Sequence, residues 1–143
     1  MGLIEERHPA LGALMALWRD RRSERGPPLA SAMWTGALAG AADIAVMIVV
    51  EQEHGGLMIR DSGAQVDALY GAALAGSDAS RLSPERDDAE REARSAMESG
   101  RPLLIEDELR GFDRRRRIAR LYLPLTNDDG SPDGVLCGVV PVG

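Results

Sequence analysis

The sequence contains a single cysteine, Cys137, among 143 residues. One cysteine excludes an intrachain disulfide and a thiolate metal cluster within one chain, so a reducing compartment is the simplest setting. Excess positive charge is also lacking, because 17 arginines, with no lysine, stand against 23 acidic residues and leave a net charge of −6. Nucleic-acid binders need a basic footprint, so this balance disfavours nucleic acid as a partner.

Targeting and membrane signals are lacking as well. Glu5 and Glu6 stand where a signal peptide carries positive charge, and the apolar residues that follow are soon interrupted by arginine. No apolar run reaches the length that a membrane-spanning helix requires. We therefore expect a cytoplasmic protein that makes no membrane contact.

The length of the chain fits one domain with a single core. At its start, proline and the helical spacing of apolar residues predict an amphipathic helix from Pro9 that is closed at Gly26. We assign residues 1–28 to this helix and its linker, and residues 29–143 to the main domain. The apolar stripe of the helix consists of Leu11, Leu14, Met15 and Trp18.

Downstream, β-branched segments predict strands, and glycine or proline marks the turns and helix ends between them. The expected order is a short helix, two strands around a glycine turn, loose helical turns, a longer helix and three strands. The corresponding segments are Leu29–Leu38, Ile44–Val50, the strand after His54–Gly56, residues 62–82, Ser83–Gly100, Leu103–Leu109, Arg117–Leu125 and Val135–Val142.

This order, with a hairpin before the helices and an antiparallel group after them, resembles the PAS fold. Further marks are similar to those of a family of short bacterial single-domain PAS proteins, and they extend from Leu11 to Val142. They are a leucine-rich helix ending in tryptophan and arginine, an arginine at a strand end, three spaced glycines, a Gly-x-Pro and a Leu-Pro-Leu: Trp18, Arg19, Arg60, Gly63, Gly71, Gly76, Gly100, Pro102, Leu123, Pro124 and Leu125.

The resemblance implies an α+β fold with a five-stranded antiparallel sheet, helices on one face, and the N-terminal helix on the other face or at a dimer interface. It also implies that the first and last strands lie side by side at the centre of the sheet. Central strands are covered on both faces, which explains why Ile44–Val50 and Val135–Val142 are apolar without alternation. Because Pro141 cannot donate a ladder hydrogen bond, we expect regular pairing to end near Val140.

The resemblance implies a regulatory signalling module without enzymatic activity, acting as a homodimer and contacting a separate signalling protein. Dimer or partner contacts are expected at the stripe Leu11, Leu14, Met15 and Trp18. The alternative is a sensor that binds a small, mostly apolar ligand between the sheet and the helices. The residues expected around that space, which otherwise form plain core, are Met47, Leu69, Tyr70, Leu74, Met97 and Leu121.

Reactive residue types are few. A Cys–His nucleophile pair needs both groups adjacent and a third orienting group. We expect His54 in a turn and Cys137 inside a strand, so no catalytic residue is predicted. The cysteine motif of flavin-binding PAS domains is missing, and neither His8 nor His54 lies where a haem ligand of a PAS domain is held. No cofactor is therefore expected.

Three charged features remain. The cluster of Asp128, Asp129 and Asp133 does not match the spacing of a calcium-binding loop, so a polar turn is favoured and no metal site is predicted. The run Arg114–Arg117 is favoured as the solvated start of a strand over an anion site. Arg60 is expected to order the turn after the second strand.

Overall fold

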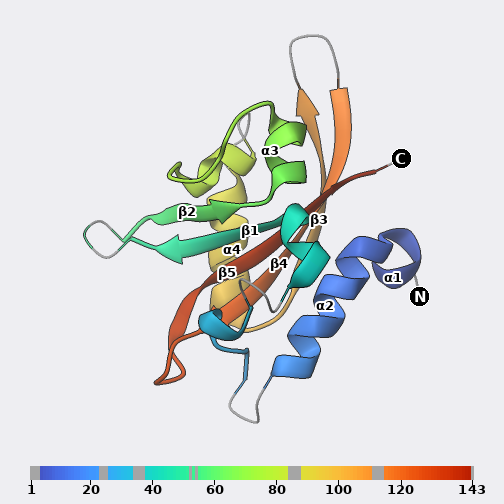
Figure 1. Cartoon of the computed structure of the whole chain (residues 1–143). Coiled ribbons are helices and arrows are strands. Elements are labelled where there is room, and N and C mark those ends of the chain that lie inside the picture. Colours follow the sequence, from blue (N-terminus) through green and yellow to red (C-terminus); the bar gives the residue numbers. More distant parts are fainter. Residues whose placement is uncertain are drawn as a thin grey trace.

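The computed structural model describes residues 4–22, 26–33, 38–51, 53, 55–83, 88–110 and 115–142. The helical elements are α1 (Ile4–Arg7), α2 (Pro9–Arg21), η1 (Ala30–Met33), η3 (Ala39–Ile44), α3 (Ala64–Tyr70), η4 (Ala79–Leu82) and α4 (Asp88–Ser99). The strands are β1 (Ala45–Val50), β2 (Leu57–Ser62), β3 (Leu103–Arg110), β4 (Arg115–Thr126) and β5 (Pro132–Pro141). Figure 1 shows how these elements are arranged.

The strands form one antiparallel five-stranded sheet in the order β2-β1-β5-β4-β3. Strand β5 is central, and it pairs with β1 so that Ala45 lies opposite Gly138 and Val49 opposite Gly134. The predicted adjacency of the first and last strands is therefore confirmed. A Cβ at Gly134 would collide with the backbone carbonyl of Ile48, so glycine permits the close approach of the two strands.

Helices cover both faces of the sheet (Figure 1). We call the face under α3, η4 and α4 the inner face, and the face under α2, η1 and η3 the outer face. Val46 and Ile48 of β1 pack on the inner face with the alanine stripe of α4, whereas Met47 packs on the outer face. This two-sided cover explains why the central strands carry no polar face.

Helix α2 packs on the outer face of its own chain. Leu11 and Leu14 are fully buried, Trp18 is 2% exposed, and the Trp18 indole N–H donates to the carbonyl of Pro124 over 2.8 Å. Gly138 leaves room for the helix, since a Cβ there would lie 2.7 Å from Leu11 Cδ2 and 2.8 Å from Leu14 Cδ2.

The expected use of this stripe as a dimer or partner surface is thus corrected for three of its residues. Leu11, Leu14 and Trp18 are core residues of the chain itself, because the apolar outer face of β4 and β5 needs a cover. Met15 alone of the four stays partly buried at the rim. The helix also ends at Arg21, earlier than the Gly26 that the sequence predicts.

A serine side chain binds the backbone near the start of α4. The Ser83 hydroxyl accepts a hydrogen bond from the Ala89 N–H over 2.7 Å, although the helix itself begins at Asp88. Arg94 pairs with Glu90 at 3.1 Å, as their spacing predicts.

Other local predictions met mixed outcomes. Of the predicted helix Leu29–Leu38, the structure has the short turn η1, and residues 34–37 lie outside the described part of the chain. Pairing of β5 does not stop at Val140: Pro141 lies opposite Ile118, and the Val142 N–H donates to the carbonyl of Arg117 over 2.8 Å. Since donors alternate along an antiparallel ladder, the nitrogen of Pro141 points away from β4, toward the side where β1 has ended.

Candidate functional site

A fully buried arginine lies on the inner face of the sheet. Arg120 of β4 is 0% exposed, between Ile118 and Tyr122, which also face the helices. The intervening residues Ala119 and Leu121 face α2 instead. Strand alternation therefore directs the arginine inward, where a charge is costly unless it is paired.

Arg120 is paired at every nitrogen of its guanidinium. Nε donates to the Tyr122 hydroxyl over 3.0 Å, and Nη1 donates to the Leu82 carbonyl over 3.2 Å. Nη2 donates to Glu92 Oε1 over 2.9 Å and to Asp107 Oδ2 over 3.0 Å. The Tyr122 hydroxyl itself donates to Glu92 Oε1 over 2.8 Å. We call these five residues the Arg120 network.

The Arg120 network joins four successive elements of the chain, η4, α4, β3 and β4. It connects β4 to α4 through Glu92, to β3 through Asp107, and to η4 through the Leu82 carbonyl. The Tyr70 hydroxyl at the end of α3 also donates to that carbonyl, over 2.7 Å. The helical layer is therefore tied to the sheet by polar contacts as well as by apolar packing.

Arg120 and the two tyrosines near it keep their protons over the physiological pH range. Burial opposes the charge of Arg120, but the neighbouring Tyr122 hydroxyl and Glu92 carboxylate outweigh it, so the pKa of Arg120 is raised. Burial is the main reason that the pKa values of Tyr70 and Tyr122 are both raised, so both phenols stay protonated. Arg120 is therefore a charged donor, and the two tyrosines are neutral donors.

Four of the six predicted pocket residues lie on the inner side. Leu74 is fully buried, and Leu69, Tyr70 and Met97 are partly buried against the inner core. The placement of the other two on that side was wrong, because they pack on the outer face with α2 and η3: Met47 and Leu121.

The inner side also holds residues that the sequence analysis missed, above all Arg120, Tyr122 and Glu92. The alternation of side chains along a strand could have identified Arg120 and Tyr122. Because Leu121, Leu123 and Leu125 face the outer side of the sheet, the residues between them must face the inner side.

Among the residues that the structure describes, cysteine and histidine do not form a catalytic pair. Cys137 is fully buried on the inner face, and burial raises its pKa to about 12, so it is a thiol and not a thiolate at neutral pH. His8 lies near α2, where Nε2 is 3.2 Å from Glu106 Oε1. That hydrogen bond is the main cause that lowers the pKa of the Glu106 carboxyl. His54 lies outside the described residues.

Comparisons with solved structures agree with this architecture. The PAS domain of a protein from Colwellia psychrerythraea is 19% identical, with a TM-score of 0.51 over 73% of this chain and 92% of that one. The PAS domain of BvgS from Bordetella pertussis is 13% identical, with a TM-score of 0.51 over 74% of this chain and 84% of that one. The chain has a PAS fold. An RNA-binding Light-Oxygen-Voltage receptor is 17% identical, with a TM-score of 0.55 over 82% of this chain and 36% of that one.

No family model matches the chain, and no curated protein is a significant match. Among the residues that the structure describes, no helix is long and apolar enough to cross a membrane. The same residues contain no cluster of histidine, cysteine and acidic side chains that would hold a metal ion.

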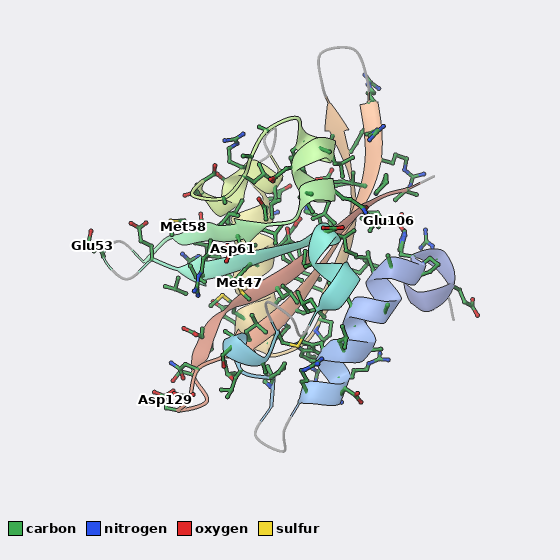
Figure 2. All side chains as sticks on the ribbon, in the orientation of Figure 1. Met47, Glu53, Met58, Asp61, Glu106 and Asp129 are labelled. Carbon is green, nitrogen blue, oxygen red and sulfur yellow. The ribbon has the colours of Figure 1, made fainter. Side chains whose placement is uncertain are left out.

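The outer face of this chain also has a groove, which lies beside β1 and β2. A hollow of about 460 Å³ lies there, which we call the outer-face groove, and its lining includes Leu29, Met47, Val49, Arg60 and Asp61. Figure 2 shows Met47 and Asp61 on neighbouring strands of this region. The groove is thus on the opposite side of the sheet from the Arg120 network.

The remaining charged features are placed as follows. Arg115 and Arg117 are exposed and pair with Glu108 at 3.5 Å and Glu106 at 3.4 Å, as solvated strand residues do, whereas Arg114 lies outside the described residues. Asp128 and Asp129 lie in a polar turn where the backbone N–H groups of Asp129 and Ser131 donate to Asn127 Oδ1, and Asp133 lies at the start of β5. The guanidinium of Arg60 is mostly exposed and lies 3.8 Å from Asp61.

Proposed function

We propose that the chain is a non-enzymatic signalling module of the PAS type that works in the cytoplasm as a homodimer and regulates a separate protein through contact. The observation that supports it best is the state of the inner side. There Arg120, Tyr122 and the buried apolar residues pack together, and every guanidinium nitrogen of Arg120 is already paired. A ligand would have to displace these bonds, whereas a protein partner needs only the surface.

Absence of catalysis is part of the proposal. Cys137 is buried on the inner face as a neutral thiol, whereas His8 lies at the start of α2 beside Glu106, so the two do not form a nucleophile–base pair. Nucleic acid is not among the proposed partners, because the net charge of −6 repels a phosphate backbone.

The homodimer in this proposal uses the exposed flank of α2. With three stripe residues buried in the chain, the apolar groups left along the helix are Met15 and Leu17, both partly buried. Both pack against the outer core cluster, as Leu104 of β3 does. We assign the dimer contact to the part of these side chains that the chain itself leaves exposed.

We expect Met15→Glu to separate the dimer without unfolding the chain. A charge at a rim position costs little in the monomer, but it is unfavourable inside an apolar interface. Sedimentation velocity should give a dimer for the wild type and a monomer for Met15→Glu, with equal thermal midpoints. The matched control Ala16→Glu, an exposed position on the side of the helix opposite the buried stripe, should stay dimeric. A wild type that sediments as a monomer at every concentration would contradict the homodimer.

Ligand sensing is the second candidate function. It is favoured by the polar groups that gather on the inner side, since Arg120, Tyr122 and Tyr70 could exchange their present partners for those of a small molecule. The two candidates differ in what the purified protein retains: a sensor keeps its ligand, whereas a contact module carries none.

A further inference from the structure

The outer-face groove is one half of a longer trough. A second hollow of about 300 Å³ adjoins it and is lined by Arg21, Pro27 and Pro28 among others. The two hollows share four lining residues, Leu29, Thr126, Asn127 and Asp128. Leu29, which is 39% exposed, is the exposed large hydrophobic residue of the described chain, and it lies between the hollows. A trough with an apolar residue at its middle suits an extended segment better than a compact ligand.

The walls of this trough are held in place by Thr126 at the end of β4. Its N–H donates to the Pro28 carbonyl over 2.9 Å, and its hydroxyl donates to the Pro27 carbonyl over 3.0 Å. Leu29 makes a parallel bridge to the same residue. The linker after α2 is therefore fixed against the sheet, and the trough is formed before any partner arrives, which lowers the entropic cost of binding.

The floor and the rim of the trough differ in character. The floor is apolar, with Met47 only 3% exposed and Val49 partly buried. The rim carries three carboxylates, Asp61, Asp128 and Asp133, and two arginines, Arg60 at the first hollow and Arg21 at the second. Within the described chain, neither Asp128 nor Asp133 has a hydrogen-bond or ion-pair partner for its side chain, and only Asp61 lies near Arg60, at 3.8 Å.

We propose that this trough docks an extended segment of a partner protein in which arginine or lysine side chains alternate with aliphatic ones. The aliphatic groups pack on Leu29 and Val49, and the cations lie against Asp128 and Asp133. Basic side chains have long apolar stems, so they match a surface that is apolar below and acidic above. The inference rests on the proposed function, because it names the surface through which the module contacts its partner.

The test uses a labelled synthetic peptide of alternating leucine and arginine and its counterpart of leucine and glutamate. Fluorescence anisotropy measures affinity for the intact chain, and amide chemical shifts locate the contact. We expect the arginine peptide to bind and the glutamate peptide not to bind. The shifts should gather at residues 29–31, 47–49, 60–61 and 126–133. Asp128→Asn with Asp133→Asn should weaken binding about tenfold, and Leu29→Ser should weaken it as well.

A matched pair of variants separates docking from general charge attraction. Glu6→Gln with Glu98→Gln removes two exposed carboxylates outside the trough and should leave the affinity unchanged. Equal weakening by both pairs, or an arginine peptide that shifts no trough residue at millimolar concentration, would overturn the inference. Failure of this inference would leave the proposed function standing, because a homodimer without ligand could contact its partner through another surface. The proposed function is tested separately, by the oligomeric state and the retained ligand.

Discussion

Replacing Arg120 with methionine is expected to lower the free energy of unfolding by about 3–5 kcal/mol, the cost of breaking a buried ion pair from one side. The substitution leaves Glu92 and Asp107 facing a position that no longer donates, with side chains only 12% and 21% exposed. The Leu82 carbonyl keeps its bond from Tyr70. Urea unfolding followed by circular dichroism measures the loss.

The same residues supply the control for this prediction. Adding Glu92→Gln and Asp107→Asn to the methionine variant removes the uncompensated charges and should recover part of the lost stability, because a buried neutral amide costs less free energy than an unpaired buried carboxylate. Arg120→Lys should fall between wild type and methionine, since one ammonium cannot serve all four acceptors. If the free energy of unfolding of Arg120→Met lies within about 0.5 kcal/mol of the wild-type value, the network does not stabilise the fold.

The second large effect is expected on the other face. Changing Leu14 and Trp18 together to glutamate places two charges against the apolar outer face of the sheet, where the native side chains are at most 2% exposed. Truncation of such residues alone costs roughly 2–5 kcal/mol each, and domains have only about 5–15 kcal/mol in total. We expect the double variant to be largely unfolded, so that it shows no cooperative thermal transition at the wild-type midpoint. An unchanged midpoint would contradict the packing of α2 on its own sheet.

Gly138 tests that packing from the side of the sheet. A Cβ at this residue would press on Leu11 and Leu14, so Gly138→Ala should destabilise the chain by about 1–3 kcal/mol through overpacking. Leu14→Ala opens space at the same point. The double variant should therefore cost less than the sum of the two single changes, as coupled neighbours do. If the free-energy costs of Gly138→Ala and Leu14→Ala simply add, α2 does not pack on Gly138.

Most of the fold could be predicted from the sequence because its signals are local and agree with one another. The paired apolar segments, the glycine turn and the stripe of α2 each indicate one element, and the resemblance orders them. The error at Pro141 arose from considering the residue without its neighbours. A proline interrupts a ladder only on the side to which its nitrogen points, and there β1 has already ended.

The site was less predictable for a physical reason. Strands buried on both faces have no polar row that tells inward from outward residues, so Met47 and Leu121 were assigned to the wrong side. Arg120 was overlooked because a single charge in an apolar strand does not reveal its partners. Glu92 and Asp107 are 28 and 13 residues away in sequence, and only the folded chain brings them together.

Native mass spectrometry of the chain purified from its own source is the most direct measurement, because it reports oligomeric state and retained ligand together. A contact module whose inner side is filled by the Arg120 network should appear at twice the mass of the bare chain, with nothing added. Mild declustering conditions should not change that mass. A chain that carries a small molecule in stoichiometric amount, or one that is monomeric throughout, would contradict the proposed function.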